Sequence, residues 1–176
     1  MQCEVGEGDI VFDVGGCFGE TAIYFSRFCG ESGKVFTFEP HEYFFSQLRQ
    51  NVANFPVVQP VNAGLGSEEA ATTMNFNAKS SRATITTIDH FVEKSGLQRV
   101  DFIKMDIEGA ERDALKGATK ILKAMRPKLA ISVYHLPDDI RIISQLILDA
   151  YGENCDLYMK NVTNTYGETV LFAVPK

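Results

Sequence analysis

The sequence predicts an α/β fold, a doubly wound and mostly parallel sheet of about seven strands with helices between most of them. Short apolar runs alternate with amphipathic stretches from one end of the chain to the other, as they do in such folds. The first apolar run leads straight into a glycine-rich turn, which commonly joins the first strand of such a sheet to its first helix. The last two runs are separated by a short turn, so the C-terminal strand is expected to be antiparallel.

Each expected element follows from a local pattern. Apolar runs predict strands at 9–14, 34–40, 57–63, 99–106 and 127–135, helical spacing predicts helices at 20–29, 41–55, 109–125 and 139–151, and a terminal strand pair is expected at 155–161 and 168–175 with its turn around 164–167. Pro60 places the third strand at an edge of the sheet, because proline cannot donate a ladder hydrogen bond. Asp138 is expected to cap the last helix.

The segment between the third and fourth main strands is less regular. Residues 64–77 are typical of a turn followed by an exposed strand, and residues 80–96 of a loop, a short strand and a helix that ends at Gly96. We expect this insertion to contribute to substrate specificity.

The composition is that of one globular domain of 176 residues, 45% of them hydrophobic and 23% charged. A net charge of −6 without a basic cluster argues against nucleic acid as a partner. The four cysteines lack the spacing of a metal site, and no leader or membrane-length apolar run is present, so we expect reduced thiols, no membrane partner and a cytoplasmic location. The oligomeric state is left open.

The glycine-rich turn indicates the kind of cofactor. Its pattern, D-x-G-G-x-x-G, differs by one position from the spacing that holds a dinucleotide pyrophosphate. Asp13 and Glu20 flank the place where two phosphates would lie, and like charges there are costly. A cofactor that carries a cation fits better, and S-adenosyl-L-methionine has both an ammonium and a sulfonium. Asp13 is the expected partner of the ammonium, directly or through water, whereas Glu20 is expected only to complement a helix dipole.

Further cofactor contacts are expected at the next two strand ends. Glu39 ends the second strand, where an acid can accept both ribose hydroxyls, although NAD and S-adenosyl-L-methionine both offer these. Asn62 ends the third strand, near the expected adenine. The predicted cofactor-binding residues are Asp13, Gly15, Gly16, Cys17, Phe18, Gly19, Glu39, Pro40, Asn62, Ala63 and Asp106.

The expected chemistry lies at the ends of the fourth and fifth strands. Asp106 and His135 are the candidate catalytic residues, because a hydroxyl that receives a methyl group must lose a proton to a base. Asp106, Glu108 and His135 are alternatively a divalent metal set, but their spacing is not a metal signature and no metal is predicted. Glu111 is expected only to satisfy exposed helix amides, and Lys104 to extend its amine to solvent or to pair with an acid. The other two histidines, His41 and His90, are expected at the surface.

Four blocks of the chain together resemble the FkbM-type methyltransferases. The blocks are "VFDVGGCFGETAIYFSR", "KVFTFEPHEYFFSQLRQNV", "TTIDHFVEKSGLQRVDFIKMDIEGAERDALKGATKIL" and "RPKLAISVYHLPDD". The resemblance implies the class I methyltransferase Rossmann-like fold, S-adenosyl-L-methionine as cofactor, and a sugar or other small hydroxylated molecule as acceptor. The predicted single domain, 1–176, lacks most of the sequence that family members have before the first strand. Lys160 and Asn161 also stand where an arginine–histidine pair is expected.

Two other functions remain open beside an O-methyltransferase. An NAD-dependent oxidoreductase is disfavoured by the glycine spacing and by the flanking acids. A module that binds the cofactor without catalysing transfer is suggested by the short N-terminal region.

Overall fold

The protein folds as a seven-stranded sheet with a smaller sheet attached at one edge. A computed structural model of the chain describes residues 3–76, 79–161 and 168–176. The main sheet has the order β3-β2-β1-β7-β8-β10-β9. Its strands are β1 (Ile10–Val14), β2 (Lys34–Phe38), β3 (Val58–Val61), β7 (Phe102–Met105), β8 (Lys128–Ser132), β9 (Cys155–Asn161) and β10 (Thr169–Pro175).

The strand directions agree with the sequence prediction. β1, β2, β3, β7 and β8 pair in parallel, and β10 runs antiparallel to both β8 and β9. β3, which contains Pro60, is an edge strand as predicted. The expected turn at 164–167 lies outside the described residues.

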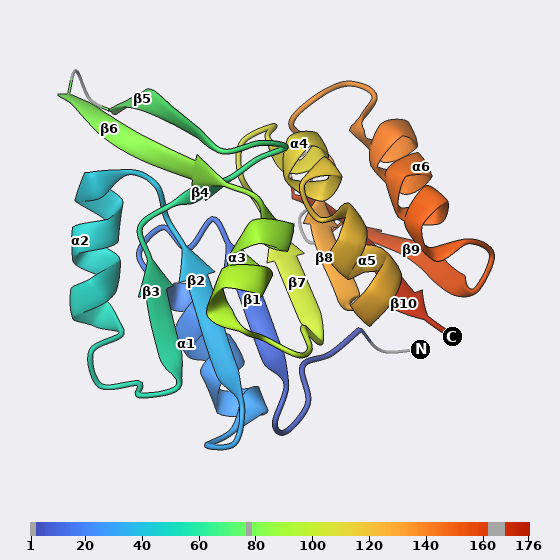
Figure 1. The fold of residues 1–176 in the computed structure, drawn as a ribbon, viewed down its shortest axis with the longest axis horizontal. Helices are drawn as coiled ribbons and strands as arrows, with labels where there is room; N and C mark the ends of the chain where they lie inside the picture. The colour runs from blue at the N-terminus through green and yellow to red at the C-terminus, as the bar shows by residue number, and fades with distance from the viewer. Residues whose placement is uncertain (1–2, 77–78, 162–167) are drawn as a thin grey trace.

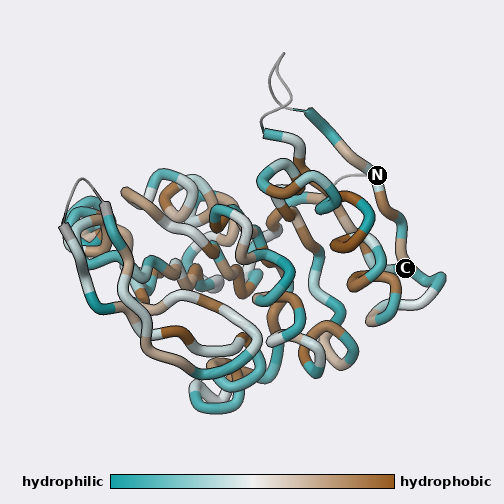
Figure 2. Tube along the Cα trace, turned by 90° about the horizontal axis from the view of Figure 1, so that it is seen from above, coloured by the Kyte–Doolittle hydropathy of each residue, from teal (hydrophilic) through white to brown (hydrophobic). Residues whose placement is uncertain are grey.

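Helices cover both faces of the sheet (Figure 1). They are α1 (Glu20–Cys29), α2 (Glu42–Asn51), α3 (Ile88–Ser95), α4 (Glu111–Lys116), α5 (Thr119–Met125) and α6 (Asp139–Tyr151). α1 and α2 pack on the face that contains Val11 and Val35, whereas α3 to α6 pack on the face that contains Phe12 and Ile103. In Figure 2 the helices carry hydrophilic and hydrophobic residues within the same turn, as amphipathic helices on a sheet do.

The expected helix at 109–125 is two helices, and this corrects the sequence prediction. α4 ends at Lys116 and α5 begins at Thr119, with Gly117 and Ala118 between them. A side chain on Gly117 would come within 2.0 Å of the carbonyl oxygen of Gly66, so another segment presses on the chain at this point. Asp89 of α3 accepts the first free amides of α5, from Lys120 and Ile121, at 3.0 Å each.

The insertion forms a second sheet above the ends of the main strands (Figure 1). Its order is β4-β6-β5, with β4 (Gly64–Leu65), β5 (Ala70–Phe76) and β6 (Lys79–Thr86), and β5 and β6 make an antiparallel hairpin. The sequence predicted an exposed strand within 64–77 and a separate short strand within 80–96, and it did not predict their pairing. α3 ends at Gly96 as expected.

Asp138 does not cap α6 through its side chain, which is a second correction. It stands at the N-cap position but makes no capping hydrogen bond. Its carboxylate pairs instead with Arg112. Asp139, the first residue of α6, accepts the amide of Leu136 in the preceding turn at 2.7 Å.

The cysteines and the lengths of the helices bear on the expected thiol state and on the expected lack of a membrane span. All four cysteines are free, as predicted. Within residues 3–76, 79–161 and 168–176, no helix has the length and apolar character needed to cross a membrane.

Candidate active site

The glycine turn brings the end of β1 against the end of β7. The turn follows Val14, and Gly15 has a φ of +85°, which favours glycine. A Cβ on Gly15 would lie 2.0 Å from the backbone oxygen of Asp106. Gly15 is therefore required by contact between two segments of the chain.

The other two glycines of the turn are also tightly enclosed. A Cβ on Gly16 would lie 2.1 Å from Oγ1 of Thr37, and one on Gly19, which has a φ of +95°, would lie 2.9 Å from Val52. The turn is thus fixed by β2 and by the end of α2 before any ligand is present.

Asp13 is completely buried beneath this turn, with 0% of its side chain exposed. Its carboxylate accepts the hydroxyls of Thr21 at 2.9 Å and Thr37 at 3.0 Å, and forms an ion pair of 3.1 Å with Lys104. Lys104 also donates to the carbonyls of Val14, at 3.3 Å, and Gly15, at 2.8 Å. The ion pair of Asp13 and Lys104 therefore fixes the start of the turn through the hydrogen bonds of Lys104 to its carbonyls. The expected pairing of Lys104 with an acid is found.

Glu39 connects the end of β2 to the same turn. Its Oε2 accepts the amide of Cys17 at 3.1 Å, and its Oε1 accepts the amide of His41 at 2.8 Å. Burial raises the pKa of the Glu39 carboxyl, while the two amide hydrogen bonds oppose that rise. Each carboxylate oxygen keeps a second lone pair for a hydroxyl donor.

The remaining predicted cofactor residues surround this point. Asn62 donates to the backbone oxygens of Glu39, at 2.9 Å, and Pro40, at 3.4 Å, so it fixes the end of β2. Ala63 is buried next to it. Cys17 is exposed with a φ of +47°. The partly buried Phe18 packs its ring against Phe44 with centroids 5.3 Å apart.

His41 is buried, which corrects the expectation that it lies at the surface. Only 5% of it is exposed. It is the N-cap of α2, and its Nδ1 accepts the amide of Tyr43 at 3.2 Å. His90 is exposed, as predicted, and lies 3.3 Å from Glu69.

The two candidate catalytic residues meet at the ends of β7 and β8. Oδ1 of Asp106 lies 3.5 Å from Nε2 of His135 and accepts the hydroxyl of Tyr134 at 3.1 Å. The side chain of Asp106 is 41% exposed, whereas that of His135 is 9% exposed. Burial and the charge of Asp106 raise the pKa of Tyr134 to about 12. The pair therefore combines an accessible acid with a buried imidazole.

Glu111, the first residue of α4, completes this group. It is fully buried, and its Oε1 and Oε2 accept the amides of Ile107 at 2.7 Å and Gly109 at 3.0 Å, which lie in the turn before the helix and not in the helix as expected. Its Oε1 also lies 3.1 Å from Nδ1 of His135, a contact that the sequence did not predict. Glu108 is 93% exposed, with Oε2 3.7 Å from Nε2 of His135.

The structure thus brings together two groups of predicted residues. The first gathers around the ends of β1, β2 and β3, and the second around the ends of β7 and β8, joined where Gly15 meets Asp106. Sequence reasoning missed the hydrogen bond from Tyr134 to Asp106 and the contact of Glu111 with His135. The signal for Tyr134 was its place directly before His135 near a strand end, whereas no local pattern indicates the contact of Glu111 with a residue of another element.

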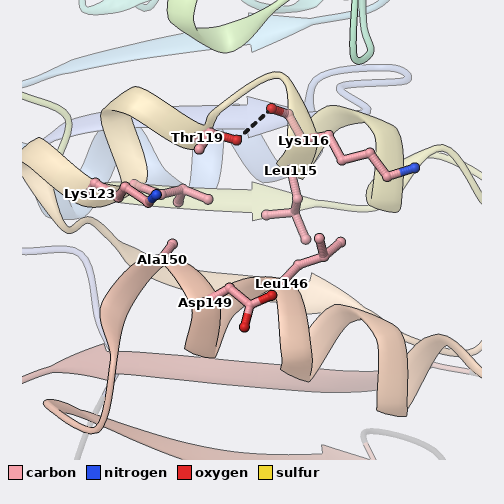
Figure 3. Close-up of a pocket in the computed structure, with 8 residues that line it drawn as sticks. Leu115, Lys116, Thr119, Lys123, Leu146, Asp149 and Ala150 are labelled. Atoms are coloured by element: carbon pink, nitrogen blue, oxygen red, sulfur yellow. Dashed lines mark hydrogen bonds between the residues drawn. The ribbon is translucent and has the colours of Figure 1, made fainter.

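A small pocket lies elsewhere, between α4, α5 and α6 (Figure 3). Its volume is about 100 Å³, and Leu115 and Leu146 face each other across it. None of the residues that line it is a predicted site residue.

Comparison with known proteins identifies the family. The sequence model of the Methyltransferase FkbM domain matches residues 13–162, well over half of the chain. The chain belongs to the FkbM methyltransferase family. The predicted resemblance is therefore confirmed.

The individual relatives of this FkbM-family chain share less than a third of their aligned residues with it. It is 29% identical over 160 residues to the hexuronic acid methyltransferase AglP of Haloferax volcanii, a match that includes 84% of this chain and 64% of AglP. Among solved structures, the methyltransferase FkbM from Methylobacillus flagellatus aligns with a TM-score of 0.80 and 24% identity, over 94% of this chain and 43% of that one. Fibrillarin from Aeropyrum pernix, solved with natively bound S-adenosyl-L-methionine, aligns with a TM-score of 0.62 and 16% identity. The alignment covers 97% of this chain and 68% of the fibrillarin chain.

The two structural likenesses show the class I methyltransferase fold for this FkbM-family chain. The chain spans about two fifths of the Methylobacillus chain and slightly less than two thirds of AglP.

Proposed function

We propose that this protein transfers the methyl group of S-adenosyl-L-methionine to a hydroxyl oxygen of a sugar. In that reaction the acceptor O–H bond loses its proton, an O–CH3 bond forms, and the S–CH3 bond breaks. The electron pair of the broken bond stays on sulfur, so the second product is S-adenosyl-L-homocysteine. The protein supplies position and removal of the proton, because the cofactor already carries the activated group.

The observation that carries the proposal is the contact between the glycine turn and the end of β7. A cofactor laid across the turn at Gly15 would have Asp106 beside it, since the backbone of Asp106 encloses Gly15. Family membership and the class I methyltransferase fold support this arrangement. The ends of parallel strands are also where ligands bind in such sheets.

The residues around the turn have distinct proposed roles. Glu39 would accept the ribose hydroxyls with the lone pairs that its amide partners leave free. Asn62 would fix the strand end on which the adenine rests. Asp13 is buried and paired with Lys104, so its support of the cofactor would act through the shape of the turn.

Asp106 and His135 are the residues proposed to assist loss of the hydroxyl proton. They would do so as a base that takes the proton, or as ligands of a cation that lowers the pKa of the hydroxyl. Asp106 is the more accessible of the two and would face the acceptor.

A sugar acid is the first acceptor to test. The relative AglP is a hexuronic acid methyltransferase. A hexuronic acid offers a carboxylate oxygen beside its hydroxyls, so methyl transfer would give either an ether or an ester.

Purified protein incubated with radiolabelled S-adenosyl-L-methionine and hexuronic acids, neutral hexoses or phenols tests the proposal. We expect label in a hexuronic acid or hexose, retained after mild alkali, because an ether resists the treatment that releases methanol from an ester. Asp106→Asn and His135→Ala should each reduce transfer by about 100-fold or more, the usual effect of losing proton-transfer assistance.

Three results would contradict the proposal in different ways. Binding of NAD without binding of S-adenosyl-L-methionine would indicate an oxidoreductase. Cofactor binding with no transfer to any acceptor, unaffected by either substitution, would indicate an inert binding module. Label released completely by alkali would move the reaction from a hydroxyl to the carboxylate.

A further inference from the structure

We propose that Asp106, Glu111 and His135 form a binding site for a divalent transition-metal cation. This inference rests on the proposed function, because it concerns the same end of the sheet. One ligand atom from each of the three residues lies within 4.8 Å of the other two. The residues come from the end of β7, the start of α4 and the end of β8, so three separate elements converge on one point.

The imidazole of His135 lacks the partners that a structural histidine would have. The side chain is 9% exposed, and both ring nitrogens are shielded from solvent. Neither nitrogen has a hydrogen-bond partner among the described residues, although Glu111 lies 3.1 Å from Nδ1 and Asp106 lies 3.5 Å from Nε2. Buried polar groups left without a partner are rare and call for an explanation. A cation bound to one ring nitrogen, with the other donating to a carboxylate, would supply both partners.

The charges of the group also call for a cation. Asp106, Glu108 and Glu111 surround His135, and no lysine or arginine in the described part of the chain lies within 4.0 Å of these acids. Arg112, the neighbour of Glu111, is turned to Asp138 and Asp139, and Lys104 is turned to Asp13. The basic side chains closest in sequence are therefore already committed elsewhere.

Glu111 is held in the orientation that a ligand needs. Its two oxygens accept the amides of Ile107 and Gly109, which fix the carboxylate while leaving one lone pair on each oxygen. The hydroxyl of Tyr134 fixes Asp106 in the same way. Ligands oriented by a second set of hydrogen bonds are typical of metal sites.

The donor set and its exposure indicate the kind of cation. Two carboxylates and one imidazole mix oxygen and nitrogen ligands, which suits Mn²⁺, Fe²⁺, Co²⁺ or Zn²⁺ better than Ca²⁺. Three protein ligands leave coordination positions open, and the 41% exposure of Asp106 places them toward solvent and acceptor. A hydroxyl bound there would have a lower pKa and would release its proton to water, with His135 as a ligand and not as the base.

Direct measurement of Mn²⁺ binding tests the site without relying on activity. Protein stripped with a chelator is titrated with Mn²⁺, and the free ion is followed by electron paramagnetic resonance. We expect one bound Mn²⁺ per chain. Asp106→Asn and His135→Asn should each weaken binding by about tenfold or more. Asp113→Asn is the matched control, since it removes an exposed acid of α4 that pairs with Lys116, and it should leave the affinity unchanged.

Glu111→Gln should weaken binding as well, but its buried side chain also supports the local backbone. Circular dichroism therefore accompanies each titration. The exposed Asp106 keeps the test decisive if the Glu111 variant does not fold.

Absence of Mn²⁺ binding at concentrations up to about 1 mM would overturn the inference. A Kd of that size corresponds to a binding free energy of about −4 kcal/mol. Equal affinity in the wild type, Asp106→Asn and His135→Asn would also overturn it. Calorimetric titration of the same samples with S-adenosyl-L-methionine separates the two proposals. Cofactor binding without Mn²⁺ binding would overturn only the metal site, whereas Mn²⁺ binding without cofactor binding would overturn only the proposed function.

Discussion

At the residue scale, the buried pair of Asp13 and Lys104 is the best example of a side chain acting through its neighbours. The buried carboxylate of Asp13 accepts hydrogen bonds from Thr21 and Thr37 and pairs with Lys104. The amine of Lys104 in turn donates to the carbonyls of Val14 and Gly15 at the start of the turn. An acid before a glycine turn was predicted to contact the cofactor. The structure gives it a packing role that no local pattern distinguishes from ligand binding, because the partners come from β2, α1 and β7.

Replacing Lys104 by methionine should destabilise the protein by about 3 kcal/mol, since it leaves the Asp13 charge buried without its cation. The measurement is urea unfolding. The double variant Asp13→Asn/Lys104→Met should lose less than the sum of the two single variants, because both remove the same pair. Strict additivity would show that the pair is not coupled.

Glu39 should make the stability of the protein depend on pH in a recognisable direction. Burial raises the pKa of its carboxyl in the folded protein above the ordinary value of 4.5. The folded state then holds the proton more tightly than the unfolded chain. This stabilisation is fully present below the unfolded pKa and is lost as pH rises through the folded pKa.

In Glu39→Gln, the free energy of unfolding should therefore fall less between about pH 4 and pH 7 than it does in the wild type. Glu42→Gln, at an exposed position near the start of α2, serves as the control for removing one acid. If the free energy of unfolding depends on pH equally in the wild type, Glu39→Gln and Glu42→Gln, the carboxyl of Glu39 is not the group responsible.

At the scale of elements, local patterns predicted most of the strands and helices but not how separate segments meet. The helix at 20–29 and the edge position of β3 follow from apolar spacing and from Pro60, which are properties of a few adjacent residues. The break between α4 and α5 depends on Gly66 and Asp89, which lie far away in the sequence. The hairpin of β5 and β6 likewise depends on pairing that strand patterns do not specify.

The same distinction applies to the candidate site. Asp106, His135 and Glu39 were predicted because acids and histidines at strand ends collect at one edge of a parallel sheet. The contact of Glu111 with His135 and the hydrogen bond from Tyr134 to Asp106 join residues 24 and 28 positions apart, respectively. Side-chain direction decides these contacts, and the sequence pattern does not contain it.

The contact between the β1 turn and β7 can be tested at one glycine. Gly15→Ala should destabilise the protein by about 3 kcal/mol or more, from an unfavourable φ together with a collision against the oxygen of Asp106. Gly96→Ala is the matched control, because Gly96 has a φ of +65° but nothing within 4 Å of the added carbon. It should cost only about 1 kcal/mol.

Thermal unfolding compares the two glycine variants under identical conditions. An equal loss of stability at the two positions would mean that backbone conformation alone determines the effect. In that case the meeting of Gly15 with Asp106 would not be tight in solution.

At the scale of the whole molecule, cofactor binding should stabilise the fold as a unit. The proposed cofactor residues come from the ends of β1, β2, β3 and β7, so a ligand there would connect four of the seven main strands. A ligand that binds only the folded state adds a free energy set by its concentration relative to Kd, about 2.7 kcal/mol at 100 times Kd. For a chain of this length, that corresponds to a rise in Tm of about 5–10 °C.

S-adenosyl-L-homocysteine is the ligand for this experiment, since it keeps the nucleoside and the amino-acid group but cannot react. We expect Tm to rise with its concentration, and Glu39→Gln to require more ligand for the same rise because a ribose contact is lost. NAD, which also carries ribose hydroxyls, should not raise Tm, because its pyrophosphate would lie between acids at a turn with the wrong glycine spacing. A larger rise with NAD than with S-adenosyl-L-homocysteine would contradict the proposed cofactor, whereas a rise with neither would mean that the residues at these strand ends do not form a cofactor site in this chain.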